Sequence, residues 1–157
     1  MDRMYTVVVS GTASPAAAFD ILEINGAAGK PVALQRMIIT QTSEPTTEEE
    51  QLFVQVIKGF TTSGSGGSAP TPVPIDTNTP AAGFAAEVMN TTVAVSGTTF
   101  TLLDMAFNSR AGLDLALAPN EQPTITGNAS TERMVVRIGA PADAVTFRAT
   151  FWLREML

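Results

Sequence analysis

The strongest pattern in the sequence is an alternation of side chains near its C-terminal end, between Val145 and Arg154. One set of alternate positions is apolar: Val145, Phe147, Ala149, Phe151 and Leu153. The other set is mostly polar: Thr146, Arg148, Thr150, Trp152 and Arg154. A period of two is typical of a β-strand with one buried face, whereas an amphipathic helix repeats about every 3.6 residues. The chain is therefore expected to build at least one sheet that covers a core.

Similar alternation, or short apolar runs between turn residues, predicts further strands along the chain. The predicted ranges are 4–10, 17–24, 32–41, 51–58, 87–95, 99–107, 113–117 and 133–138. A short loop at 139–143 joins the last of these to the C-terminal strand, so the two form a predicted pair. The strand at 51–58 is apolar on both faces, which indicates a central position. The polar stretch 42–50 offers at most a helical turn.

Composition supports an all-β fold. The chain has 157 residues, close to the ~150 of one domain. It contains 21 Thr, 12 Gly and 10 Pro, a mixture that favours strands joined by turns over helices. With about eight to nine short strands, the sequence predicts a jelly roll or another β-sandwich, formed as a single domain by residues 1–157.

One segment departs from this pattern. Residues from about 60 to 82 begin with a Gly/Ser-rich stretch, 61–68, which has the composition of a flexible linker. They continue with Pro70, Pro72 and Pro74, which favour an extended arm. A loop of this length inside one domain is unusual, and neither flank has enough strands to form a domain by itself. We therefore expect a functional excursion, an arm or extended loop, and not a linker between two domains.

Residue types that are missing exclude several classes of site. The chain has no His and no Cys, which rules out Ser-His and Cys-His nucleophiles, His-ligated zinc or haem, iron–sulfur clusters and disulfides. Gly26 to Pro31 lacks the spacing of a phosphate-binding loop. The loop that starts at Asp76 has Pro80 and Ala81 where a calcium loop needs a ligand and a glycine. The sequence thus predicts no cofactor and no metal.

The charge distribution argues against nucleic acid and membrane partners. The formal net charge is -6, the pI is about 4.5 and the only lysines are Lys30 and Lys58, so no basic patch is available for phosphates. No apolar run approaches the ~20 residues of a membrane span. The apolar run 7–9 is shorter than the core of a secretion signal, so we expect no targeting segment. Only 15% of residues are charged, against roughly 25% in typical proteins.

Acidic pairs and one aromatic residue remain as candidates for chemistry or binding. Asp104 with Asp114, or Asp20 with Glu23, could in principle supply two carboxylates for glycoside hydrolysis, but spacing in sequence cannot establish such a pair. Solvated or turn-capping roles are more common for acids. Trp152 shares the polar face of the C-terminal strand and could stack on a sugar or, more commonly, make a cross-strand or subunit contact. The candidate interface residues are Phe60, Pro70, Pro72, Pro74 and Trp152.

Several segments together resemble phage virion structural proteins, in particular jelly-roll capsid decoration (cement) proteins. The segments that carry the resemblance are 5–13, 55–59 with 61–67, 70–72, 90–92, 106–112 and 140–147. The resemblance implies a non-enzymatic protein on the outside of an assembled head, where it ties neighbouring subunits together. It also implies a homotrimer, a major capsid protein as partner, assembly from the host cytoplasm onto the capsid surface, and no catalytic residues.

The sequence leaves three functions to compare. The first is the decoration protein implied by the resemblance, since a rigid β-body with an extended segment suits a role between subunits. The second is a receptor- or glycan-binding module of a tail or head fibre, suggested by Trp152. The third is a hydrolase built on Asp104 and Asp114. The first is favoured, because the sequence contains no recognisable catalytic motif.

Overall fold

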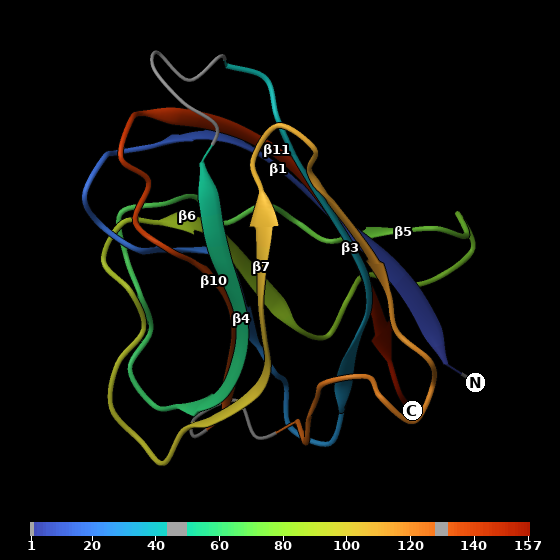
Figure 1. Ribbon diagram of the computed structural model, residues 1–157. Coiled ribbons are helices and arrows are strands. Elements are labelled where there is room, and N and C mark those ends of the chain that lie inside the picture. The colour runs from blue at the N-terminus through green and yellow to red at the C-terminus, as the bar shows by residue number, and fades with distance from the viewer. Residues whose placement is uncertain (1, 44–49, 128–131) are drawn as a thin grey trace.

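The computed structural model describes residues 2–43, 50–127 and 132–157 and arranges them as eleven strands in two antiparallel sheets (Figure 1). Sheet A contains, in spatial order, β5 (Val73–Pro74), β1 (Arg3–Ala13), β11 (Val145–Glu155), β3 (Val32–Gln41) and β8 (Leu113–Ala116), and β9 (Thr124–Ile125) also pairs with β3. Sheet B contains β6 (Ala85–Asn90), β2 (Phe19–Asn25), β10 (Arg133–Ile138), β4 (Gln51–Phe60) and β7 (Phe100–Asn108). The predicted all-β sandwich is confirmed.

The strand order is that of a jelly roll. Apart from β5, β6 and β9, the strands interleave between the sheets: β1, β11, β3 and β8 lie side by side in sheet A, and β2, β10, β4 and β7 in sheet B. The first strand thus pairs with the last, in a register that joins Arg3 to Glu155 and Ala13 to Val145. Consecutive strands such as β1 and β2, or β3 and β4, lie in opposite sheets.

The alternating patterns explain how the two sheets share one core. On β11 the apolar set predicted from the sequence is buried, with Phe147, Phe151 and Leu153 at 0% exposure. Sheet B contributes Val54 and Val136 to the same core from the other side. The outward residues remain accessible, as Val8 on β1 shows with 63% exposure. Burial of one face of each sheet is the main stabilising contribution to such a sandwich.

One predicted pairing is wrong. The strands at 133–138 and 145–154 exist, as β10 and β11, but β10 pairs with β2 and β4 while β11 pairs with β1 and β3. The loop between them crosses from sheet B to sheet A. Both patterns are satisfied because the two strands bury their apolar sides in the same core from opposite sheets. The predicted helical turn at 42–50 falls largely outside the described residues.

The chain leaves the eight-strand body between β4 and β7, which are antiparallel neighbours. The two ends of the inserted segment touch: a Cβ on Gly59 would lie 2.1 Å from the carbonyl oxygen of Thr98. Gly59 and Gly97 both have positive φ, +98° and +91°, which favours glycine at these positions. We call residues 61–98 the excursion.

The excursion lies against the body of the sandwich. Its first part runs antiparallel to a later part through bridges that join Thr62 to Val95 and Ser65 to Thr92. Its β6 adds to β2 in sheet B, and its β5 adds to β1 in sheet A (Figure 1). The linker-like interpretation of 61–68 is therefore wrong, because backbone hydrogen bonds fix this Gly/Ser-rich stretch in place. The excursion covers the outer edges of both β1 and β2.

Candidate functional site

The five candidate interface residues lie in separate parts of the molecule. Phe60 is only 6% exposed and packs on the outer side of sheet B with Ile57, Ala94 and Val135. Of the three candidate prolines, all in the excursion, Pro72 is buried, whereas Pro70 and Pro74 are half-buried. Trp152 is half-buried on the outer side of sheet A. Phe60 thus holds the excursion to sheet B, and Trp152 is the one candidate on the outer side of sheet A.

The outer side of sheet A forms an uncovered surface. Two rows of side chains cross its central strands in register: Thr6, Trp152 and Arg36 in one row, and Val8, Thr150 and Ile38 in the next. We call these six residues the sheet A face. In the described ranges, no backbone segment forms a strand or bridge over it. The sheet A face combines short hydroxyl and apolar side chains with a single charged side chain.

The charge on this face has a defined partner. Arg36 forms a two-pronged ion pair with Asp114 of β8, with contacts of 2.9 Å from Nε to Oδ1 and 2.6 Å from Nη2 to Oδ2. The hydrogen bond from Arg36 holds the pKa of the Asp114 carboxyl below its usual value. The guanidinium carbon of Arg36 also lies 5.2 Å from the centre of the Trp152 ring, in the range of a cation–π contact. Trp152 is thereby held in place and one face of its ring is occupied.

The outer side of sheet B differs from this face, because the excursion covers its part over β2 and β10, while Phe53 of β4 and Ala106 of β7 stay exposed. Asp20 of β2 is 0% exposed and accepts a 2.7 Å hydrogen bond from the backbone N–H of Ala94 in the excursion. Its carboxylate also forms an ion pair with Arg137 of β10, with 2.7 Å between Nε and Oδ1. Arg137 donates in turn to the carbonyl of Ala94 at 2.9 Å and lies 5.0 Å from the ring centre of Phe60. One buried ion pair thus fastens the returning half of the excursion.

A second buried carboxylate fastens the outgoing half. Glu23 is 0% exposed and accepts hydrogen bonds from the hydroxyl of Ser63 at 2.6 Å and from the N–H of Gly64 at 2.9 Å. Asn90 donates to the same carboxylate at 3.2 Å, and Nε of Arg133 lies 3.4 Å away. These contacts satisfy the charge of Glu23 within the fold. The sequence-based expectation that such acids are solvated or cap turns is wrong for Glu23, which is buried in β2 and binds the excursion.

The far end of the excursion is fastened to sheet A. Glu155 of β11 is 0% exposed and accepts a 2.9 Å hydrogen bond from the N–H of Gly83. The Tyr5 hydroxyl donates to the carbonyl of Pro80 at 2.9 Å and lies 3.3 Å from the Glu155 carboxylate. Burial, together with the negative charge of Glu155, raises the pKa of Tyr5. Three buried acids therefore act as anchors for the excursion, and none is left free for catalysis.

The acidic pairs considered for hydrolysis do not form a catalytic site. Asp104 lies on β7 of sheet B and accepts a 3.0 Å hydrogen bond from Gln55, whereas Asp114 lies on β8 of sheet A in its ion pair with Arg36. Asp20 and Glu23 share a face but each binds a different arginine and a different part of the excursion. Across the described residues, no three acidic side chains come together as a metal site.

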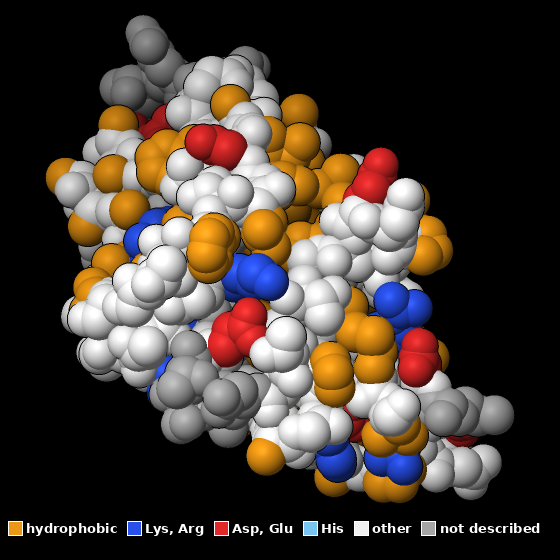
Figure 2. All heavy atoms as spheres, turned by 90° about the horizontal axis from the view of Figure 1, so that it is seen from below, with side chains coloured by type: hydrophobic (Ala, Val, Ile, Leu, Met, Phe, Trp, Pro, Cys, Tyr) orange, Lys and Arg blue, Asp and Glu red, His pale blue; other side chains and the backbone are white. Residues whose placement is uncertain are grey.

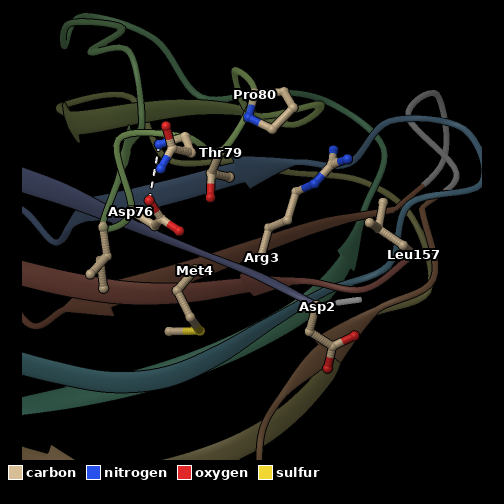
Figure 3. A pocket seen from close by; sticks show the side chains of 9 residues that line it. Asp2, Arg3, Met4, Asp76, Thr79, Pro80 and Leu157 are labelled. Atoms are coloured by element: carbon tan, nitrogen blue, oxygen red, sulfur yellow. Dashed lines mark hydrogen bonds between the residues drawn. The ribbon is translucent and has the colours of Figure 1, made fainter.

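An open pocket of about 510 Å³ lies where the two ends of the chain meet the excursion (Figure 3). Arg3, Leu157 and Asp76 are among the residues that line it. The carboxylate of Asp76 accepts a hydrogen bond from the N–H of Asn78, which shapes the loop on one side.

Comparisons with known proteins give no family and only distant structural likenesses. No family model and no curated protein matches the sequence. A solved structure of the infectious bursal disease virus Gx strain is 16% identical, with 99% of this chain and 32% of that chain covered and a TM-score of 0.34. The VP2 subviral particle of the same virus gives 10% identity, coverage of 99% and 42%, and a TM-score of 0.24.

The chain therefore spans less than half the length of these viral proteins. At such TM-scores the likeness carries no argument about what this chain does. In the part of the chain that the structure describes, no helix is long and apolar enough to cross a membrane.

Proposed function

We propose that this chain is a non-enzymatic structural protein of a virion, a decoration protein that binds the outside of a phage head and stabilises neighbouring major capsid subunits. In this proposal the protein is made in the host cytoplasm and acts on the capsid surface, with three copies at each position on the shell, as the sequence resemblance implies. The 157 residues act as one jelly-roll domain, and the excursion is part of its body.

The observation that carries the proposal is the contrast between the two sides of the sandwich. The excursion covers the part of the outer side of sheet B over β2 and β10, whereas in the described ranges no strand or bridge lies over the sheet A face, which three central strands form. Central strands are rigid because neighbours bind them on both sides, so this surface can dock without losing much conformational entropy. The fixed Trp152 and the paired Arg36 are residue types enriched at the centre of interfaces, and the exposed Val8 adds apolar area beside them.

A sparsely charged exterior also fits this role. Figure 2 shows, from the lower end of the molecule, small apolar groups separated by uncharged polar atoms, with few acidic or basic side chains. The net charge of -6 disfavours contact with the packaged genome. Both properties support a protein that binds a protein shell.

A glycan-binding module is the alternative, and the arrangement of Trp152 weighs against it. Sugars stack on the face of an exposed aromatic ring. Arg36 occupies one face of the Trp152 indole, and the ring is only half-exposed at its position on β11. A glycan array with a strong signal that is lost in Trp152→Ala would favour this alternative.

Replacing Val8 with aspartate is expected to weaken binding to heads that lack this protein by at least about tenfold, because it places a charge at the centre of the apolar contact. The measurement is a titration of such heads with the purified chain, followed by a thermal stability assay of the heads. Val95→Asp is the matched control, since Val95 is 48% exposed but lies on the excursion. Absence of binding by the unmodified chain, or equal weakening by both variants, would rule out this docking surface.

A further inference from the structure

The four outer edges of the sandwich are protected very unequally. At one side, the excursion covers both sheets, since β5 lies along β1 and β6 lies along β2. The new edge at β6 is itself covered in part, because Ser68 exchanges two backbone hydrogen bonds with Val88. At the other side, the edges are β8, which has 4 residues, and β7, which has 9. Within the described ranges, β7 pairs only with β4.

Beyond a β-bulge near its start, β7 lacks the features that usually protect an edge strand. Natural edges are short, contain a β-bulge, or carry lysine, proline or an inward-pointing charge. β7 has none of these residues, and its one charged side chain, Asp104, accepts a hydrogen bond from Gln55 of β4. The one irregularity in its pairing with β4 lies near Thr101, which leaves Leu103 to Asn108 in regular register. A long, regular and weakly charged edge is a template for another strand.

Apolar side chains beside this edge are incompletely covered. Leu103 and Met105 of β7, with Leu113 and Leu115 of β8, pack against the core but remain half-exposed where the two sheets end. Farther along β7, Phe100 is 56% exposed and Leu102 is 44% exposed. On the covered side, Val73 and Ile75 are also exposed, but they lie on and just after β5, which has only 2 residues. The β7 side is therefore the place where the core is open to a partner.

We propose that β7 pairs with β7 of a second copy of this chain, antiparallel and about a two-fold axis, so that the two B sheets form one continuous sheet. A second copy of β7 fits this edge because one register of self-pairing sets compatible side chains opposite each other. In an antiparallel pair, two residues directly opposite each other have their side chains on the same face of the sheet. When a strand pairs with its own copy about a two-fold axis, this condition holds only if one residue lies opposite itself at the axis. We call that residue the centre of the pairing. A centre at Asp104 sets two carboxylates against each other, and a centre at Leu103 runs into the irregularity near Thr101.

A centre at Met105 avoids both problems. It places Met105 opposite its own copy and Leu103 opposite Phe107, so that three core-facing apolar positions continue the core across the contact. On the outer face it places Asp104 opposite the uncharged Ala106, twice by symmetry. This contact does not involve the sheet A face and does not depend on the proposed function. It joins two copies, whether or not three copies gather on a shell.

The register can be tested by charge at one exposed position. Ala106→Glu places like charges opposite each other at both Asp104 positions, and we expect the dimer dissociation constant to rise about tenfold. Ala106→Lys places opposite charges there and should keep or tighten the dimer. Both effects should shrink in high salt. Ser10→Glu is the control, since Ser10 is exposed on β1, far from the β7 edge in strand order.

The measurement is sedimentation equilibrium of the full chain from low to high micromolar concentration, with hydrogen exchange of the β7 amides. The expected result is a mass of two chains of 16.4 kDa, with the two Ala106 variants moving the dissociation constant in opposite directions. A monomer at every concentration overturns the proposal. So does a dimer or trimer whose stability responds equally to Ala106→Glu, Ala106→Lys and Ser10→Glu.

Discussion

The Asp20→Ala variant is expected to lose about 3–5 kcal/mol of unfolding free energy. Asp20 is fully buried, and its removal leaves the guanidinium of Arg137 without its carboxylate and the N–H of Ala94 without its acceptor. An unpaired buried charge costs far more than the original pair contributes, because it has lost both water and its partner. Chemical denaturation of the variant and the unmodified chain measures the difference.

Two controls separate this effect from the loss of an ordinary acid. Asp104→Ala removes an exposed carboxylate with one hydrogen bond, from Gln55, and should change the stability by no more than about 0.5 kcal/mol. The double variant of Asp20 and Arg137 should be less destabilised than the sum of the two single variants, because it leaves no unpaired charge. A loss below about 1 kcal/mol in Asp20→Ala would contradict the role of this ion pair as an anchor.

The Phe151→Ala variant is expected to lose a similar amount, about 3–5 kcal/mol, for a different reason. Phe151 is 0% exposed at the centre of β11, between Val7 of β1 and Met37 of β3 in register. Its truncation removes apolar contacts and leaves a cavity that the rigid sheets cannot close. Val8→Ala, on the neighbouring strand at 63% exposure, is the control and should have little effect.

Hydrogen exchange should distinguish the two variants. Loss of the Phe151 ring lowers the stability of the whole sandwich, so protection should fall in both sheets. Loss of Asp20 should also expose the amides of the excursion near Ala94 preferentially, because its anchor is gone. If both variants gave the same exchange pattern, the excursion would not be a separately anchored part of the fold.

Most strands could be predicted because their patterns are local. The alternation at 145–154 and the apolar run at 32–41 each place apolar side chains on the buried face of one strand. Both strands appear with nearly the predicted bounds. The partners of a strand could not be derived in the same way. Strands β10 and β11 are close in sequence and bury their apolar sides in one core, and a hairpin and a crossover between sheets satisfy that pattern equally well.

The anchors of the excursion could not be predicted for a related reason. Asp20 and Glu23 are three residues apart and would face opposite sides of a regular strand. In β2 the pairing with β10 shifts by one residue at Ile21, so both acids lie on the outer side of sheet B. Bulges of this kind leave no clear trace in a single sequence. The Gly/Ser-rich composition of 61–68 was equally uninformative. Glycine in this stretch permits close backbone contact with residues such as Thr92, but the same composition is also typical of a flexible linker.

The pairing of β1 with β11 has a consequence for how the chain reaches its native state. Arg3 lies opposite Glu155, so the central pair of sheet A forms between the first and last parts of the chain. Closing such a long loop is entropically costly before any contact compensates for it, and domains dominated by non-local pairing typically fold in milliseconds to seconds. During synthesis, the apolar side of β1 must wait for β11, which is made after the other ten strands that the structure describes. Until β11 is available, the unpaired β1 can mispair with strands of other nascent copies.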